Sequence, residues 1–377
     1  MIKQIKNARI ITDGKTIDNY DIFIEDGKII DVLPEANNEY EIIDLQGAYI
    51  APGFIDLHCH GGDGVEFVDA TEDSIKRACD MHSSHGTRVM FPTISAYSYD
   101  MTYKALEAIE KLKDSCSLEI AGVHLEGPYL APEMCGAQDT QYITAPIKED
   151  YERLIERFGS LISRWTYAPE RDNGTFTKAL SKHGIVPSCG HSSAEYDDLN
   201  KAFENGCNLI THLYSCTSTI TRHGGFRHLG IIETAYLLDD MFVEAIGDGR
   251  HLPAELLRMI IKIKGSDRVC LITDAISFAG MEKIDNLVGG TSSVPYIIED
   301  GVAKLADRSA FAGSIATTDL ILKRTVEAGI PLAETVKMLT ETPAKVMKLN
   351  TKGKIKKGYD AQFTIFDKDL NVLNIDI

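Results

Sequence analysis

The chain has 377 residues, of which 44% are apolar and 25% charged, and this ordinary globular composition excludes a disordered or collagen-like protein. Its 39 basic and 56 acidic residues give a net charge of −17. Nucleic acid and anionic membranes both attract positive surfaces, so we expect neither as a partner. No apolar stretch approaches the roughly 18 residues of a membrane span and no secretory signal pattern is visible, so we expect a cytoplasmic protein. The eight cysteines lack disulfide or C-x-x-C spacing, which predicts reduced, mostly buried thiols.

Short alternating strands separated by Asp-Gly turns are predicted near the start of the chain, at 2–11, 20–25 and 28–33. From Gly53 onward, apolar runs of five to eight residues alternate with segments of helical periodicity, which predicts repeated βα units and a parallel sheet. Eight such runs are present, and eight strands close a (β/α)8 barrel of the TIM type. The runs are 54–60, 88–95, 120–127, 164–169, 185–191, 208–214, 242–247 and 269–274.

After the eighth run, the pattern predicts a Gly-Gly hairpin, further strands and two amphipathic helices before the final strands. These elements are expected at 289–290, about 294–305, about 316–328, about 331–348, 354–355 and 362–366. Because β patterns stand at both ends, we expect residues 1–52 and 353–377 to form one small β-sandwich domain beside the barrel. The barrel itself is expected to span residues 53–352.

Polar residues stand at or just after the ends of six apolar runs, where the active sites of such barrels lie. The period of two in a strand puts His58 and His60 on one side and Cys59 on the other. Imidazole and carboxylate together are typical ligands of Zn and Fe, so these residues predict a divalent-metal site. The candidates are His58, His60, His124, Glu126, His191, His212, Asp248, His251 and Asp274.

Seven short motifs in this region also resemble those of a known family. They are IDLHCH at 55–60, HLEGP at 124–128, GH at 190–191, THLY at 211–214, DGRH at 248–251, TDA at 273–275 and AGS at 312–314. The order and sequence of these motifs are similar to those of the N-acetylglucosamine-6-phosphate deacetylases of the amidohydrolase superfamily. The resemblance covers about residues 1–367. The HLEGP, GH and THLY motifs are specific to that branch, whereas many related hydrolases share H-x-H.

The resemblance implies a metal-dependent amidohydrolase of amino-sugar catabolism that converts N-acetylglucosamine 6-phosphate into glucosamine 6-phosphate and acetate. It implies that Glu126, His191 and His212 bind a divalent cation, with His58 and His60 available for a second. Zn and Fe are the expected metals, and one or two ions per subunit remain possible. No Lys ends the fourth run, so Glu126 is the natural substitute for a carboxylated lysine. The resemblance further implies Asp274 as the catalytic acid and base, and a homodimer.

Substrate contacts carry over less completely, because three segments depart from the family pattern. Gln138 replaces a histidine, Ser215-Cys216-Thr217 replaces Asn-Ala-Met, and the loop at 221–228 is longer. The family's phosphate-binding arginine, which reaches in from the partner subunit, matches Arg227, and the longer loop leaves Arg222 as the alternative. The implied substrate contacts are Ala137, Gln138, Ser215, Cys216, Arg227, Asp248, His251, Phe311, Ala312 and Gly313.

Two alternatives remain at this point. The same chemistry would serve N-acetylgalactosamine 6-phosphate or another N-acylated sugar or amine, and a non-catalytic scaffold is disfavoured because the ligands and Asp274 are all present. With a net charge of −17, an anionic substrate needs local donors. We expect them in a basic cluster, and the phosphorylated-sugar hypothesis loses its main physical support if that cluster points away from the metal. The cluster consists of Arg222, His223, Arg227, His228 and Arg250.

Overall fold

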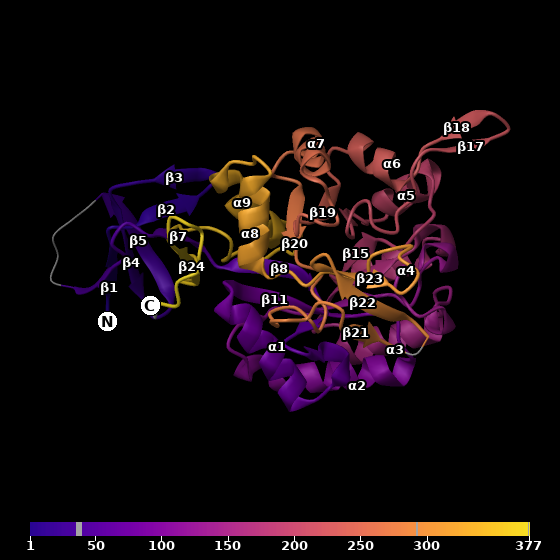
Figure 1. The fold of residues 1–377 in the computed structure, drawn as a ribbon, viewed down its shortest axis with the longest axis horizontal. Coiled ribbons are helices and arrows are strands. Elements are labelled where there is room, and N and C mark those ends of the chain that lie inside the picture. The colour runs from indigo at the N-terminus through magenta and orange to yellow at the C-terminus, as the bar shows by residue number, and fades with distance from the viewer. Residues whose placement is uncertain (35–39, 292, 376) are drawn as a thin grey trace.

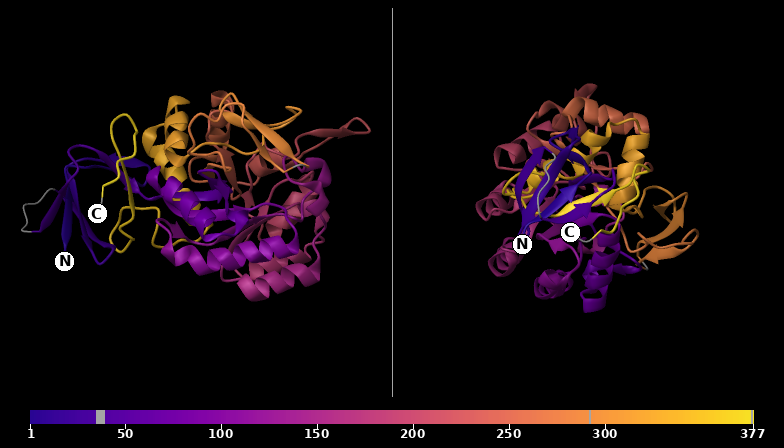
Figure 2. Two further views of the ribbon diagram at one scale, coloured as in Figure 1. Left: turned by 60° about the horizontal axis from the view of Figure 1, so that its bottom comes forward. Right: turned by 90° about the vertical axis from the view of Figure 1, so that its left-hand side faces the viewer.

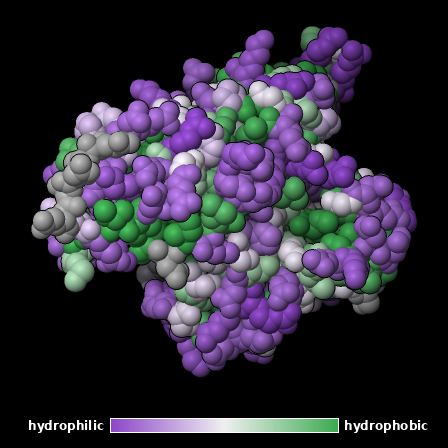
Figure 3. All heavy atoms as spheres, turned by 60° about the vertical axis from the view of Figure 1, so that its left-hand side comes forward, coloured by the Kyte–Doolittle hydropathy of each residue, from purple (hydrophilic) through white to green (hydrophobic). Residues whose placement is uncertain are grey.

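The structure is a computed structural model that describes residues 1–34, 40–291, 293–375 and 377. A barrel with its surrounding helices forms the larger body, and a small β domain at one end of the molecule holds both chain termini (Figures 1 and 2). The face shown in Figure 3 is mainly hydrophilic, with hydrophobic side chains gathered in separate patches. Within the described ranges, no helix combines the length and apolar character needed to cross a bilayer.

Eight parallel strands form the barrel, which confirms the predicted fold class. The last strand meets the first where the Asp274 N–H donates to the His58 carbonyl at 2.9 Å, and an isolated bridge joins Cys59 to Ala275. A short strand, β12 (Glu119–Ile120), precedes β13 and pairs in parallel with β11 at Val89 and Met90. The barrel strands are β8 (Phe54–Cys59), β11 (Thr87–Ile94), β13 (Val123–Glu126), β14 (Ile162–Tyr167), β15 (Val186–Cys189), β16 (Leu209–Ile210), β19 (Phe242–Ile246) and β20 (Val269–Ile272).

Amphipathic helices cover the barrel because each places one apolar face against the strands. In α1, the N-cap Thr71 accepts a hydrogen bond from the Ser74 N–H at 3.0 Å, and Ile75, Ala78 and Cys79 are buried at helical spacing. The covering helices are α1 (Glu72–Ser84), α2 (Tyr99–Leu112), α3 (Lys148–Phe158), α4 (Thr175–Lys182), α5 (Tyr196–Glu204), α6 (Ile231–Leu237), α7 (Ala254–Lys264) and α8 (Thr318–Glu327).

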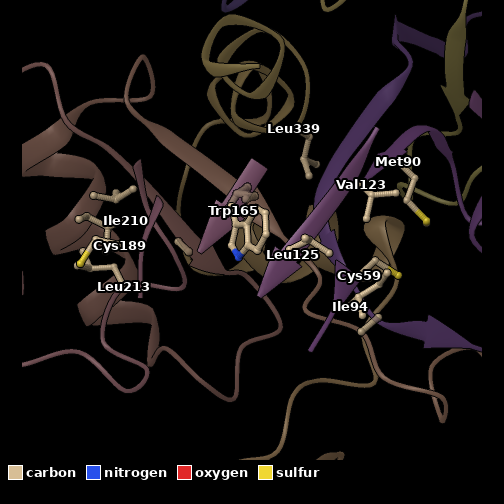
Figure 4. Close-up of a cluster of buried hydrophobic side chains, with 14 of the residues drawn as sticks. Cys59, Met90, Ile94, Val123, Leu125, Trp165, Cys189, Ile210, Leu213 and Leu339 are labelled. Atoms are coloured by element: carbon tan, nitrogen blue, oxygen red, sulfur yellow. The ribbon is translucent and has the colours of Figure 1, made fainter. Parts of the chain in front are cut away.

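Trp165 lies at the centre of the hydrophobic core between the strands and the helices (Figure 4). Its ring stacks on Tyr129 with centroids 5.8 Å apart, and its indole N–H donates to the Gly127 carbonyl at 2.8 Å. A second core joins side chains from six barrel strands to α10 (Glu341–Val346), and it fills the barrel interior. Buried apolar side chains on both sides of the strands explain why the barrel runs are nearly continuous in apolar residues.

The small domain is a β-sandwich of two four-stranded sheets built from both ends of the chain. The sheet orders are β5-β4-β1-β6 and β24-β7-β2-β3, and one core of mainly isoleucine side chains lies between them. The C-terminal β24 pairs antiparallel with β7, which ties the two chain ends together. The strands are β1 (Lys3–Lys6), β2 (Arg9–Thr12), β3 (Lys15–Ile17), β4 (Tyr20–Glu25), β5 (Lys28–Pro34), β6 (Glu41–Asp44), β7 (Tyr49–Pro52) and β24 (Phe363–Phe366).

Three predicted elements differ from the structure. The helix expected at 331–348 is two helices, α9 (Leu332–Leu339) and α10, because Pro343 has no N–H with which to continue the ladder. Residues 354–355 form no strand, and the Ile355 N–H donates instead to the Thr12 hydroxyl at 3.1 Å. The glycines 289–290 end a strand rather than forming the turn itself, part of which lies outside the described residues.

Shorter elements lie mainly in the loops that follow the carboxyl ends of the barrel strands, whereas Lys113–Ser115 lies between α2 and β12. A three-stranded sheet, β21 (Val288–Gly290), β22 (Pro295–Glu299) and β23 (Val302–Leu305), packs on a small apolar core of its own. A two-stranded hairpin, β17 (Thr221–His223) and β18 (Phe226–His228), extends away from the body (Figure 1). The remaining short elements are β9 (Gly61–Gly62), β10 (Val65–Glu66) and the 3-10 helices Phe67–Asp69, Lys113–Ser115, Pro132–Met134, Thr140–Tyr142 and Pro169–Arg171.

Candidate active site

The carboxyl ends of five barrel strands bring six of the predicted side chains together. His58 is the penultimate residue of β8, and Glu126 is the final residue of β13. His191, His212 and Asp274 each stand two residues beyond the end of a strand. Five of the six residues are buried and His60 is partly buried, and the side chains of His60 and Asp274 are each 11% exposed. The parallel arrangement explains this convergence, since the strands all end at one rim of the barrel.

The converging side chains form two groups of three, and in each group the potential ligand atoms lie within 4.8 Å of one another. In the first group, Glu126 Oε1 lies 3.2 Å from His191 Nε2 and 2.9 Å from His212 Nε2. The second group consists of His58, His60 and Asp274, and Asp274 Oδ1 lies 3.3 and 3.2 Å from the two Nε2 atoms. Glu126 connects the groups, because its Oε1 also lies 3.4 Å from His58 Nε2.

The imidazoles are oriented as metal ligands would be. Each of the four turns Nδ1 toward an acceptor, so that Nε2 is left facing the centre of the site. The Nδ1 partners are Glu244 Oε2 at 3.2 Å for His58, Ser95 Oγ at 3.1 Å for His60, the Met134 carbonyl at 2.9 Å for His191 and the Ser215 carbonyl at 3.1 Å for His212. Hydrogen bonds of this kind fix the tautomer that presents the Nε2 lone pair to a cation. The donor set of four imidazoles and two carboxylates therefore fits divalent metal ions.

Three of these residues have backbone angles in the left-handed region. The φ angles are 47° at His191, 30° at His212 and 49° at Asp274, and none of the three is a glycine. Such angles carry strain that persists only where the surroundings impose it, and they cluster at functional sites. Here they turn each side chain off its strand and toward the shared centre.

The two central carboxylates are ionised at neutral pH. Burial disfavours charge on Asp274, but its interactions with the His58 and His60 imidazole groups lower its pKa to about 2. Burial likewise opposes charge on Glu126, yet His58, His191 and His212 hold its pKa well below its usual range. Both carboxylates are therefore available as ligands or as proton acceptors.

A buried ion pair beneath the site was not predicted from the sequence. Arg164 on β14 and Glu244 on β19 pair inside the barrel, and both side chains are fully buried. Glu244 Oε2 also accepts from the His212 N–H at 3.1 Å and faces His58 Nδ1 at 3.2 Å, so the pair orients two of the metal-ligand candidates. Burial opposes its charge, but Arg164 and His58 lower the pKa of Glu244 to about 2. The available signal was a charged residue inside each of two otherwise apolar runs.

Gln138, predicted to contact substrate, is anchored to Glu126. Its Nε2 donates to Glu126 Oε2 at 2.8 Å, and its Oε1 accepts from the Ala96 N–H at 2.8 Å. The side chain is buried at the edge of the cavity. Its amide therefore holds the Glu126 carboxylate, while one side of the residue still borders the cavity.

A cavity of about 1110 Å³ opens above the ligand groups. Eight of the ten predicted substrate contacts line it, namely Ala137, Gln138, Ser215, Cys216, His251, Phe311, Ala312 and Gly313. Asp248 does not line the cavity. It accepts from His251 Nδ1 at 2.7 Å and from the His251 N–H at 2.9 Å, so it holds His251 at the cavity wall.

Arg227, the tenth predicted contact, lies on the exposed β17–β18 hairpin and does not line the cavity of its own chain. The hairpin register pairs Arg227 directly with Arg222, so both guanidinium groups share one face. None of the five members of the predicted basic cluster borders this cavity, so within one chain the cluster does not supply the expected physical support for a phosphorylated sugar. Among the described residues, the lysine and arginine that border it are Lys304 in β23 and Arg308 just after that strand. The phosphate role of Arg227 stays a prediction.

The barrel, its paired imidazoles and its carboxylates define a hydrolase of the metal-dependent, amide-cleaving class. The chain belongs to the amidohydrolase family, whose family model matches residues 49–376. It is 30% identical over 371 residues to an N-acetylglucosamine-6-phosphate deacetylase of Lysinibacillus sphaericus, covering 97% of this chain and 94% of that one. An N-acetylgalactosamine-6-phosphate deacetylase of Shewanella sp. (strain ANA-3) is 25% identical, with 98% and 93% covered.

The fold is also similar to a solved relative. The crystal structure of N-acetylglucosamine-6-phosphate deacetylase from Pasteurella multocida superposes with a TM-score of 0.91 and 29% identity, covering 99% of this chain and 97% of that chain. The predicted family resemblance is thus confirmed over nearly the whole length.

Proposed function

We propose that the protein hydrolyses the acetamide of N-acetylglucosamine 6-phosphate to acetate and glucosamine 6-phosphate, in cytoplasmic amino-sugar catabolism. The observation that carries the proposal is the Asp274 carboxylate, 3.2 Å from His60 Nε2 and 3.3 Å from His58 Nε2, at a cavity that also contains Glu126, His191 and His212. A proton-accepting carboxylate beside a donor set suited to metal is the arrangement that amide hydrolysis needs. The full-length similarity to N-acetylglucosamine-6-phosphate deacetylases supports the choice of substrate.

Glu126, His191 and His212 would hold one divalent cation, Zn or Fe, and His58, His60 and Asp274 would contribute to a second. A cation in such a site supplies a Lewis acid for the acetyl oxygen and lowers the pKa of a water molecule toward roughly 7. The protein keeps the ligands in place through the Nδ1 hydrogen bonds, the buried Glu244 and the Gln138 amide.

Asp274 carries the proton transfers in this proposal. Its ionised carboxylate accepts a proton as water adds to the acetyl carbon. The same carboxyl group then donates that proton to the amide nitrogen, because an amine leaves the tetrahedral carbon only when it is protonated. The products are acetate and the amino sugar, and Asp274 returns to its ionised state.

The sugar occupies the cavity, and its phosphate needs local positive charge because the protein is acidic overall. Within one chain, Lys304 and Arg308 border the cavity. We also propose a homodimer in which the hairpin face bearing Arg222 and Arg227 meets the cavity of the partner subunit. Two like charges placed directly opposite on a hairpin destabilise it unless an anion lies between them, and a phosphate would serve.

One alternative substrate has a specific observation in its favour. The Shewanella relative acts on N-acetylgalactosamine 6-phosphate, and the departures at Gln138, Ser215 and Cys216 all border the cavity. The contacts between the cavity wall and the sugar select one hexosamine over another, so changed residues in this wall can change the preferred substrate. Other N-acylated sugars or amines would use the same chemistry. A non-catalytic scaffold is disfavoured because the ligand candidates and Asp274 converge.

A substrate screen tests the proposal. N-acetylglucosamine and N-acetylgalactosamine, each free and as the 6-phosphate, are incubated with the Zn- or Fe-supplied protein, and acetate release is measured. We expect the highest kcat/KM for N-acetylglucosamine 6-phosphate. A higher value for the galactosamine compound would replace the substrate but keep the mechanism. No acetate from any of the four would contradict the proposal.

A further inference from the structure

We propose a further divalent-cation site, of the zinc type, at the base of the β17–β18 hairpin. Its ligands are Glu195, which immediately precedes α5, and the two hairpin histidines His223 and His228. The site is separate from the hydrolytic centre, since none of these three side chains borders the cavity. The proposal does not depend on which sugar the enzyme cleaves.

The three side chains already have the spacing of a ligand set. His223 Nε2 lies 2.9 Å from Glu195 Oε1, and His228 Nδ1 lies 3.1 Å from Glu195 Oε2. The two imidazole rings stand 4.6 Å apart at an angle of 82°, and the three ligand atoms fall within 4.8 Å of one another. Ligands around a tetrahedral zinc with bonds of about 2.0–2.1 Å are roughly 3.3 Å apart, so only small side-chain movements would admit the ion.

The strand register explains how two histidines from a short hairpin meet one carboxylate. Thr221 pairs with His228 and His223 pairs with Phe226, so these four side chains project from one face of the hairpin. Glu195, which belongs to the body of the protein, contacts that face of the hairpin. The Thr221 hydroxyl also donates to Glu195 Oε1 at 3.1 Å. Arg222 and Arg227 project from the opposite face, away from the ligands.

The base of the hairpin is joined to the start of α5, where Glu195 bridges Gly230 and the Tyr196 N–H donates to the Leu229 carbonyl at 3.0 Å. Beyond that base, the described contacts are mainly the side-chain contacts with Glu195. The hairpin forms a two-stranded sheet of its own, every strand residue except His228 is exposed, and Phe226 is 77% exposed. Two-stranded hairpins are marginally stable in water, and exposed hydrogen bonds between histidine and carboxylate contribute little. A cation bound by both strands and by Glu195 would fasten the hairpin to the start of α5, as structural metals do in small folds.

The chemistry of the donor set selects the class of cation. Two imidazole nitrogens and one carboxylate suit zinc and related transition metals, whereas Mg²⁺ and Ca²⁺ prefer oxygen ligands. Three protein ligands leave a fourth position for water, but none of the three borders the cavity that would hold a substrate. We therefore infer a structural ion that fixes the orientation of the face bearing Arg222 and Arg227.

Zinc stoichiometry tests the site directly. The holoenzyme and the triple variant Glu195→Gln/His223→Gln/His228→Gln are dialysed against the same free zinc and analysed for bound metal. We expect the wild-type protein to bind one more zinc per chain than the triple variant. The matched control is His183→Gln, because His183 is an exposed histidine whose ring Nδ1 lies 2.8 Å from the Ala179 carbonyl, outside the proposed ligand set, and it should keep the full count. Equal counts for wild type and triple variant would overturn the site.

Tryptic cleavage after Arg222 and Arg227 provides the second readout. With the hydrolytic centre already saturated, zinc at about ten times the Kd of the new site should slow cleavage of the wild-type hairpin about tenfold. The triple variant should show no such protection. If its thermal unfolding midpoint is lowered, the single variant His223→Gln, altered at a side chain that is 61% exposed, repeats both measurements. Protection that is the same in wild type and variants would overturn the role of the ion in holding the hairpin.

Discussion

Gln138 Nε2 donates a hydrogen bond of 2.8 Å to Glu126 Oε2, while Glu126 Oε1 faces His191 and His212 at 3.2 and 2.9 Å. The bond fixes the rotation of the one carboxylate that lies between the two ligand groups. A glutamine here departs from the histidine expected in relatives, and its position explains what the amide does. It positions Glu126 and is itself held by the Ala96 N–H.

Replacing Gln138 by leucine should weaken metal binding, because Glu126 loses its donor and the Ala96 N–H loses its acceptor. We expect metal affinity to fall by roughly 10–100-fold, the usual effect of removing a partner of a metal ligand. Competition with a metal chelator measures the change. Gln138→His, which can still donate, should recover most of the affinity. Unchanged affinity in the leucine variant would refute this role for the amide.

Asp274→Asn should remove the proton carrier while keeping the shape of the site. We expect kcat to fall by at least about 10²–10⁴-fold, the contribution typical of a general acid and base. Metal content per chain, measured in parallel, should equal the wild-type value, because the four imidazole groups and Glu126 remain in place. A variant that retains full acetate release would exclude Asp274 from catalysis.

Arg164→Met should be strongly destabilising, because it leaves the buried Glu244 carboxylate without its partner. Removing one member of a buried ion pair costs about 3–5 kcal/mol in the free energy of unfolding. Urea unfolding of the metal-free proteins measures the difference. The matched control, Arg153→Met, alters an exposed arginine of α3 whose guanidinium lies over the Tyr99 ring, and it should change the free energy of unfolding by no more than about 1 kcal/mol. Equal effects of the two substitutions would disprove the importance of the pair.

Removal of bound metal should abolish acetate release, because the metal is what lowers the pKa of the attacking water in the proposed mechanism. After dialysis with a chelator, activity should return on addition of Zn or Fe and not on addition of Mg²⁺, which prefers oxygen ligands. Acetate release at the full rate by protein shown to be metal-free would rule out the metal-dependent mechanism.

Arg227→Ala should raise KM for phosphorylated sugars by about 10–100-fold, as expected when a charged hydrogen bond is lost, and should leave free N-acetylated sugars unaffected. If the hairpin serves the partner subunit, mixing this variant with Asp274→Asn should restore activity, because each mixed dimer then has one site with both residues. Arg308→Ala is the comparison, because Arg308 borders the cavity of its own chain. If KM for phosphorylated sugars rises only in Arg308→Ala, the phosphate is bound within one subunit and not by the hairpin of its partner.

Local patterns in the sequence predicted most of the fold and the centre of the site. Apolar run length and turn residues gave the eight barrel strands, and the period of two placed His58 and His60 together. Their Nε2 atoms lie 3.2 Å apart, with Cys59 turned instead toward His82. The helix break before Pro343 was missed even though a proline inside a helical pattern is a local signal.

The sequence by itself determined which side chains stand at the barrel rim, because strand periodicity and strand ends are properties of neighbouring residues. Only the tertiary structure decided which partners those side chains have. Arg164 and Glu244 are 80 residues apart in the chain, and the Gln138–Glu126 bond depends on the path of a loop. The same holds for Glu195, which meets His223 and His228 of the β17–β18 hairpin across 28 and 33 residues of chain. Contacts between distant segments are set by packing, and no local pattern encodes them.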